Sequence, residues 1–346
     1  MSIKVIKPGM LSHFQDKGRW GYQALGVSVC GAMDLLSHQL ANVIVGNTSD
    51  FATLEITLMG PTLQFTAGCC VCLTGADMQA KLNDKPVSRY RPIIINPGDT
   101  LALPMAKEGT RAYLAVYGGF AIEAVMGSQS TYLRSGFGGW HGRGLKADDE
   151  IGLNVSLPAK QEQRQALSET LWNKRIYLPS VLGVWSSRKS VIRWIRSETW
   201  PELTSDSQMA MQQTPWRVAN DADRMGFRLD GPKLSLKSQK ERLSEPATFG
   251  TVQLPTSGQP IVLMADRQTT GGYAKLGCIA SVDLPILAQK KPGDHVRFMA
   301  IDLAQASALD AARQEALGEL SVQLTSMRRC ISDAATPATH SGGSST

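Results

Sequence analysis

The side chains best suited to chemistry in this chain of 346 residues lie in one short stretch, residues 265–273. A carboxylate, a guanidinium, an amide, two hydroxyls and a phenol follow one another there, as Asp266, Arg267, Gln268, Thr269, Thr270 and Tyr273. Gly271 and Gly272 carry no side chain, so a ligand or a partner's backbone can come close. Because Arg, Gln and Tyr are not turn formers, the stretch favours a functional site over an ordinary polar turn, which is the alternative.

A buried strand is expected to position this stretch. The apolar run from Ile261 to Met264 follows Pro260 directly and is short, which is typical of a strand rather than a helix. The polar residues are therefore predicted at the end of a strand, where a rigid sheet can hold loop side chains in place.

Length and composition predict a β-rich protein of two domains. The chain exceeds the usual size of a single domain, and its 32 glycines and 17 prolines imply many turns. The hydrophobic share of 42% and the charged share of 19% are typical of globular proteins. Met1 to Lys4 show no apolar signal core, and no apolar run approaches the roughly 18 residues that span a bilayer. A cytoplasmic protein without a membrane partner is expected.

The net charge of +6 does not indicate a nucleic-acid partner, because Lys and Arg are spread along the chain. The densest basic segment lies within residues 184–200, where Arg188, Lys189, Arg193 and Arg196 alternate with tryptophans. Such a segment could form an interaction surface. The prediction is a solvated amphipathic helix, in which long basic side chains cover apolar surface.

The cysteines and histidines do not form a metal-binding pattern. Strand alternation puts Cys70 and Cys72 on one face and Cys69 on the other, which is a poor start for a tetrahedral zinc site. Free thiols in the core of a protein from a reducing compartment are predicted instead. The five histidines form neither HxxxH nor HExxH, so no metal site is expected.

The first half reads as a helix among closely spaced strands. Residues 35–44 have helical apolar spacing, with Asp34 as N-cap and Gly46 as terminator. Strands are predicted from alternation and turn signals at residues 3–6, 54–58, 62–65, 71–73, 93–95, 100–103 and 112–116.

The second half repeats several turn phrases of the first, after a polar helical stretch at residues 160–172. Leu58 to Leu63 is echoed by Leu229 to Leu234, and Pro97 to Leu101 by Pro292 to Val296. These echoes favour two similar β domains, at residues 1–170 and 171–305. A helix is predicted at 306–330, and the polar tail at 331–346 is predicted to be disordered.

Common catalytic phrases are absent from the sequence. The glycine-rich residues 136–144 do not match a P-loop and do not lead into a helix, and no GxSxG occurs. Motif chemistry alone therefore predicts only a two-domain β protein with polar loops at strand ends.

A series of ordered phrases nevertheless resembles one family. They are Gln15-Asp16 with Gly18-Arg19, Gly31 to Asp34, Val45 to Asn47, Leu54-Glu55, Leu73 to Asp77, Tyr113 to Val116, Gly127-Ser128 with Ser130-Thr131, Gly142-Arg143, Asp223 to Leu229 and Asp266 to Tyr273. Over residues 1–305 the chain resembles the biotin-dependent carboxyltransferase-like family, which contains the C subunit of 5-oxoprolinase, the allophanate hydrolase subunit 2 domain and the Kip antagonist protein. The resemblance implies two cyclophilin-like β-barrels with a few short helices.

Three functions are open to a member of this family. The resemblance implies first a subunit of an ATP-dependent 5-oxoprolinase, a hydrolase that opens the lactam of 5-oxo-L-proline to L-glutamate. The alternatives are a regulatory protein that binds a histidine-kinase inhibitor, and the carboxyltransferase module of a biotin-dependent urea carboxylase or allophanate system. The first reading implies the companion 5-oxoprolinase subunits as partners, namely a B-type β protein and an A-type protein, with ATP used by the complex. Biotin is not expected on this chain, because no carrier phrase is present.

The resemblance also suggests roles for individual residues. Opening a lactam requires cationic or NH donors for developing negative charge and a carboxylate for water. Arg224 and Arg267 suit the first task, while Asp77 and Asp266 suit the second. An internal ion pair that braces loops is the alternative for Asp77 and Arg224. The substrate-binding candidates are Gln15, Asp16, Arg19, Asn47, Glu55, Thr74, Arg267, Gln268, Thr269, Thr270, Gly271, Gly272 and Tyr273.

Overall fold

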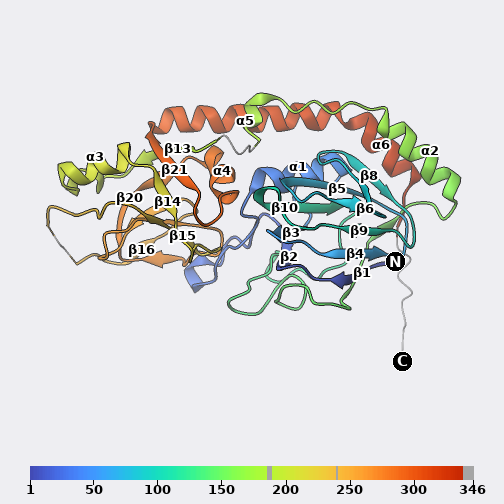
Figure 1. Ribbon diagram of the computed structural model, residues 1–346, viewed down its shortest axis with the longest axis horizontal. Helices are drawn as coiled ribbons and strands as arrows, with labels where there is room; N and C mark the ends of the chain where they lie inside the picture. Colours follow the sequence, from blue (N-terminus) through green and yellow to red (C-terminus); the bar gives the residue numbers. More distant parts are fainter. Residues whose placement is uncertain (185–188, 239–240, 338–346) are drawn as a thin grey trace.

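The computed structural model describes residues 1–184, 189–238 and 241–337. Within them the chain forms two β-rich halves, and one long helix runs along both (Figure 1). The predicted mainly β fold is confirmed, with a closed barrel in the second half. The boundary at residues 170 and 171 stays a prediction, and the first barrel strand begins at Val191.

Two sheets of the first half enclose one apolar core. The six-stranded sheet has the order β11 (Glu150–Gly152), β1 (Ser2–Lys7), β4 (Thr62–Phe65), β9 (Thr100–Ala102), β6 (Lys81–Leu82) and β7 (Lys85–Pro86). The five-stranded sheet has the order β2 (Leu11–Gln15), β3 (Thr53–Thr57), β10 (Glu108–Val116), β5 (Cys69–Asp77) and β8 (Pro92–Ile95). Val5, Phe14 and Leu114 are among the residues buried between the sheets. Each strand predicted in this half from alternation is found within a few residues of its expected position.

Helix α1 (Leu35–Val45) packs on the other face of the five-stranded sheet. Asp34 caps it by accepting a hydrogen bond from the backbone N–H of Ser37 at 2.9 Å, and Gly46 ends it with a left-handed φ of 98°, as predicted. Cys70 and Cys72 lie in the core beneath α1, whereas Cys69 lies in the core between the sheets. These three thiols are free and buried, which confirms the prediction of core cysteines.

The second half is a closed seven-stranded barrel. Its order is β13 (Val191–Arg196), β20 (Ala274–Ile279), β17 (Thr251–Leu254), β18 (Ile261–Leu263), β15 (Gly226–Asp230), β14 (Trp216–Val218) and β21 (His295–Ala300). Alternate residues such as Trp194, Phe227 and Val262 fill its interior. The strand predicted just before Asp266 is therefore confirmed as β18.

The predicted amphipathic helix within residues 184–200 is wrong. Residues 191–196 form β13, which pairs with β20 and β21, and Trp194 is fully buried inside the barrel. Ile192 and Trp194 are two residues apart, so they face the same side of a strand and enter the core together. Trp185 lies outside the described residues.

Short elements connect these parts. The two small pairs are β12 (Val155–Ser156) with β22 (Thr336–Pro337) and β16 (Glu245–Pro246) with β19 (Thr270–Gly271). Helices α2 (Gln161–Trp172), α3 (Ser205–Gln213) and α4 (Leu284–Ala288) complete the two halves. The helix predicted at residues 160–172 is thus confirmed as α2.

Two C-terminal helices replace the single helix predicted at 306–330. Helix α5 (Leu303–Gln323) starts at a capping box between Asp302 and Gln305, and α6 (Thr325–Ala334) follows after Leu324. Residues 331–337, predicted to be disordered, instead end α6 with the buried Ile331 and form β22, while residues 338–346 lie outside the described part. Within the described chain, none of the helices combines the length and apolarity required to cross a bilayer.

Candidate functional site

Arg224, Asp266 and Glu55 meet where the two halves touch. The Nε and Nη2 atoms of Arg224 donate to the two carboxylate oxygens of Asp266, at 2.9 and 2.8 Å. Its Nη1 donates to Glu55 in β3, and its Nη2 also donates to the carbonyl of Gly31 at 2.8 Å. All three charged side chains are buried. Each guanidinium nitrogen therefore has an oxygen partner, and the ion cluster joins the barrel to the first half.

Glu55 is the anchor of this cluster in the first half. Its Oε2 accepts hydrogen bonds from the backbone N–H of Met33 at 2.9 Å and from the hydroxyl of Tyr113 at 2.8 Å. Burial raises the pKa of the carboxyl, but the charges of Arg224 and Arg111, joined by His13 once acid protonates it, outweigh burial and lower the pKa to about 2. Glu55 is thus ionised at neutral pH and acts as a counter-ion.

His13 lies beside Glu55 as a neutral group. Burial lowers its pKa to about 4. Its Nδ1 accepts from the side-chain amide of Gln15 at 2.8 Å, which leaves the ring proton on Nε2, 3.9 Å from Glu55 Oε1. The imidazole therefore adds no positive charge at neutral pH.

The ion cluster holds two loops of the barrel together. Arg224 precedes β15, and Asp266 follows β18. The backbone N–H of Asp266 donates to the carbonyl of Arg224 at 2.8 Å, and that of Met264 to the carbonyl of Met225 at 2.9 Å. These contacts fix the loops that carry Met225 and Gln268, which form opposite parts of a pocket.

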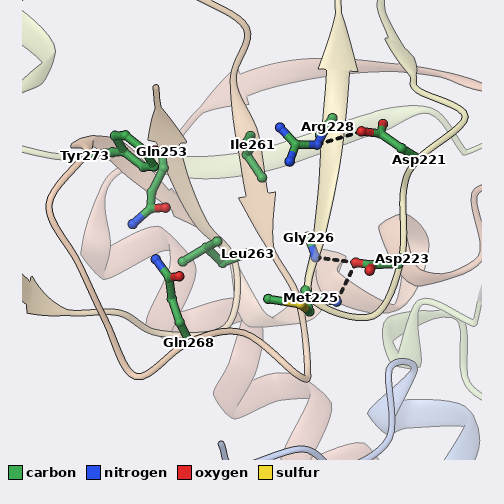
Figure 2. A pocket seen from close by; sticks show the side chains of 10 residues that line it. All are labelled: Asp221, Asp223, Met225, Gly226, Arg228, Gln253, Ile261, Leu263, Gln268 and Tyr273. Atoms are coloured by element: carbon green, nitrogen blue, oxygen red, sulfur yellow. Dashed lines mark hydrogen bonds and ion pairs between the residues drawn. The ribbon is translucent and has the colours of Figure 1, made fainter. Parts of the chain in front are cut away.

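The pocket has a volume of about 250 Å³ and lies on the outer face of the barrel (Figure 2). Its strand residues alternate with core residues: Phe227 faces the barrel interior while its neighbours Gly226 and Arg228 line the pocket. Its wall contains Asp221, Asp223, Met225, Gly226, Arg228, Gln253, Ile261, Leu263, Gln268 and Tyr273. The mixture of apolar strand residues with amide, phenol and charged groups suits a small polar molecule with an apolar ring.

Comparisons with known proteins agree with this architecture. The family model described as "Carboxyltransferase domain, subdomain A and B" matches residues 25–300. The chain belongs to this carboxyltransferase family. It is 37% identical to the C subunit of 5-oxoprolinase from Escherichia coli over 88% of this chain and 93% of the relative, and 37% identical to that of Haemophilus influenzae over 89% and 94%. The crystal structure of the K. lactis urea amidolyase superposes with a TM-score of 0.82 at 27% identity, covering 92% of this chain and 20% of that one.

In this carboxyltransferase-family chain, the predicted loop splits into separate groups. Gln268 and Tyr273 line the pocket, and Tyr273 also lines a second cavity that includes Gly272. Arg267 is buried instead: its guanidinium donates to the carbonyls of Ala247 and Ala265, at 3.3 and 3.4 Å. The remaining loop residues serve the backbone, since the carbonyl of Thr269 accepts from the N–H of Ala247 at 2.8 Å, and Thr270 and Gly271 form β19.

Five candidates of the first half are buried among protein partners. Asp16 accepts from the hydroxyl of Ser128 at 2.8 Å, and Arg19 donates to the carbonyls of Val125 and Ser130, both at 2.9 Å. Gln15, Asn47 and Thr74 likewise bond to neighbouring backbone groups of their own half, at 2.6 to 3.0 Å. These contacts brace the loops of the first half.

Asp77 is not brought to the ion cluster. It ends β5, and its carboxylate accepts from the backbone N–H of Gln79 at 3.0 Å. In residues 1–184, 189–238 and 241–337, no hydrogen bond or ion pair joins Asp77 to Arg224 or Asp266. The two aspartates predicted for the same task thus lie in different places, and only Asp266 adjoins the pocket loops.

Sequence reasoning missed Gln253, which lines the pocket from β17. Its side chain is 1% exposed, and within the described chain its Nε2 has no hydrogen-bond partner. The sequence around Gln253 does not single it out, because one amide between the apolar Val252 and Leu254 is typical of any strand with one buried face. Groups of three or more His, Cys, Asp or Glu residues arranged for a metal ion are not found among the described residues.

Proposed function

We propose that this chain is the C-type component of an ATP-dependent 5-oxoprolinase complex, which hydrolyses 5-oxo-L-proline to L-glutamate. Two relatives described as C subunits of 5-oxoprolinase support the proposal, since each matches at 37% identity over nearly its whole length. The observation that carries it in the molecule is the pocket itself, where Gln268 and Tyr273 offer hydrogen bonds beside the apolar Ile261 and Leu263. A five-membered lactam presents the matching surfaces.

In this proposal the complex activates the lactam with ATP, and this chain binds and orients the ring. Gln268 and Tyr273 hold polar atoms of the substrate, while Ile261 and Leu263 contact its methylenes. Arg224 and Asp266 are positioning residues. Their guanidinium and carboxylate pair with each other and fix the loops on both sides of the pocket. The water-activating group is then supplied elsewhere in the complex.

The pocket is open on the barrel surface, and Tyr273 is 47% exposed. We therefore expect the companion proteins of the complex, one of the A type and one of the B type, to cover it and exclude water. All three are expected in the cytoplasm. The interface should bury more than about 1,600 Å² in total, the size of a stable complex.

The test is to co-express this chain with both companions and to measure glutamate formed from 5-oxo-L-proline with and without ATP. The assembled complex is expected to be active, and the isolated chain inactive. Strong ATP-dependent release of glutamate by the isolated chain would contradict the shared site. A complex that forms without any turnover would favour the regulatory alternative, in which the chain only binds a kinase inhibitor.

Carboxyl transfer is the second candidate, favoured by the family description and by the urea amidolyase structure that shares the fold. It requires biotin on a carrier domain and bicarbonate. The assay is therefore repeated with excess avidin and without bicarbonate. Persistent glutamate formation would support the lactamase, whereas activity seen only with a biotinylated carrier and bicarbonate would overturn it.

A further inference from the structure

Gln253 occupies an unusual position on the barrel wall. In β17, its neighbours Val252 and Leu254 belong to the barrel core, so Gln253 faces outward. The pairing of β17 with β20 shifts register here, because Val252 pairs with Gly277 and Gln253 with Lys275, so the extra residue lies in β20. The outward side chain is nevertheless 1% exposed, since the loop from Gln268 to Tyr273 lies beside it (Figure 2).

Burial without a partner is costly for an amide. The Nε2 of Gln253 donates to no oxygen in the described residues, although an unpaired buried donor destabilises a fold. An apolar residue of similar size would avoid that cost. Gln253 is one of the residues that line the pocket, and a rotation of its carboxamide would bring Nε2, which has almost no exposed surface in this conformation, within reach of a ligand acceptor there.

Gly271 makes room for a second carboxamide at the same place. A Cβ atom added to Gly271 would lie 2.7 Å from Nε2 of Gln253 and 2.9 Å from Nε2 of Gln268. Real Cβ atoms do not approach so closely, so both amides depend on the absence of a side chain at this position. Figure 2 shows the two side chains pointing toward each other across the pocket.

We infer that Gln253, with Gln268 opposite it, recognises the ring amide of a cyclic ligand. A carboxamide presents an N–H donor and a carbonyl acceptor side by side. A ring forces its own amide into the cis form, so the ring N–H and C=O also point the same way and can meet both groups of one glutamine. An open-chain secondary amide is trans and offers only one of the two bonds at a time.

This inference rests on the proposed function, because a lactam is one such ligand, but it names a wider class that includes cyclic ureas. The site then discriminates by hydrogen bonding: a ring without the N–H or without the C=O leaves a buried amide atom unpaired. Met225, Ile261 and Leu263 contact the ring carbons on the remaining sides.

Calorimetric titration of the assembled complex tests the ligand class with four probes. They are 5-oxo-L-proline, L-proline without the ring carbonyl, ethyleneurea, and its N,N′-dimethyl derivative without N–H groups. We expect 5-oxo-L-proline to bind at least about tenfold more tightly than L-proline, and ethyleneurea at least about tenfold more tightly than its dimethyl form. Equal affinities within each pair would overturn the inference.

The variant Gln253→Leu gives a readout that a purely structural role would not. It should abolish the discrimination within each pair, while the Tm of the full chain stays the same or rises by about 2 °C, because a buried unpaired donor is removed. Gln253→Glu keeps the shape but loses the donor, and it should also lose the discrimination. A fall in Tm with unchanged discrimination would assign Gln253 to the fold alone.

Gly271→Ala provides an independent variant that leaves both glutamines in the sequence. Its added methyl group should displace the two amides and weaken binding of 5-oxo-L-proline about tenfold. Gly318→Ala is the matched control, since a Cβ there meets no atom within 4 Å, and it should leave binding unchanged. Unchanged binding by Gly271→Ala would contradict the paired amides.

Failure of the inference and failure of the proposed function give different results. If the complex turns over 5-oxo-L-proline and Gln253→Leu keeps the KM and the discrimination of the wild type, the function stands and the inference falls. If 5-oxo-L-proline neither binds nor reacts while ethyleneurea binds through Gln253, the inference stands and the function falls. Binding of none of the probes would overturn both.

Discussion

At the junction between the halves, each guanidinium nitrogen of Arg224 donates a hydrogen bond to a carboxylate or carbonyl oxygen. These bonds hold the carboxylates of Glu55 and Asp266 in place. In the pocket on the barrel, by contrast, the Nε2 of Gln253 is buried without a partner in the described chain. The polar groups of the junction stabilise the fold by pairing with one another. The pocket instead contains one polar group without a protein partner, which lowers stability. A buried polar residue is thus informative about binding only once its partners are known.

The largest expected effect comes from breaking the junction. Arg224→Met should lower the free energy of unfolding by about 3–5 kcal/mol, because Glu55 and Asp266 would stay buried without their counter-ion. Urea denaturation measures the change. Arg217→Met is the control: Arg217 pairs with Asp230 at 2.6 Å, but both are nearly half exposed, so about 1 kcal/mol or less is expected. A loss for Arg224→Met as small as that expected for Arg217→Met would show that the junction does not hold the fold.

The second-largest effect is expected from acid pH, which should lower the stability of the folded chain through groups at the junction. The pKa of the buried His13 is lowered to about 4, and that of Glu55 to about 2. Between pH 6.5 and 4 the unfolded chain takes up a proton at His13 that the folded chain refuses, so stability falls as pH falls, by up to about 3 kcal/mol. Glu55 contributes stability above pH 4.5, and this is lost as the pH drops toward 2.

Urea denaturation as a function of pH measures this slope. His13→Gln should make the slope shallower between pH 6.5 and 4. His38 is also buried, and burial lowers its pKa to about 4. This second histidine should account for part of the remaining slope. A pH-independent stability across this range would contradict the neutral, buried state of both histidines.

The pocket should show the opposite pattern, with activity lost and stability kept. Gln268→Ala and Tyr273→Phe are expected to lower turnover of the assembled complex by about tenfold, or about 1.4 kcal/mol in the barrier, with Tm almost unchanged. Gln212→Ala, on the exposed side of α3, serves as the control. Parallel loss of Tm and turnover would move these two residues to the structural side of the comparison.

The smallest effect is expected at Asp77. Its carboxylate accepts a hydrogen bond from the N–H of Gln79, and it does not line the pocket that contains Gln268. Asp77→Asn should therefore change turnover of the complex less than about twofold. A loss of about a hundredfold or more would restore the catalytic role predicted for Asp77 and would place the chemistry in the first half.

Local patterns determined much of this protein from the sequence alone. The helix between Asp34 and Gly46, the alternating strands of the first half and the strand before Asp266 depend on neighbours within a few residues, so they are readable in order. The pattern around Trp194 predicts an amphipathic helix, whereas these residues form the strand β13. Basic residues interleaved with tryptophans fit a helix face and a barrel wall equally well, and only the partner strands decide between them.

Only the tertiary structure decided what each polar residue does. Glu55, Arg224 and Asp266 are separated by long stretches of chain, and their mutual charge pairing arises because the barrel closes against the first half. Gln253 and Gln268 meet across Gly271 for the same reason, since β17 and the loop after β18 become neighbours only in the closed barrel. Residue type fixes which bonds a side chain can form, but the fold determines which atoms are left without one.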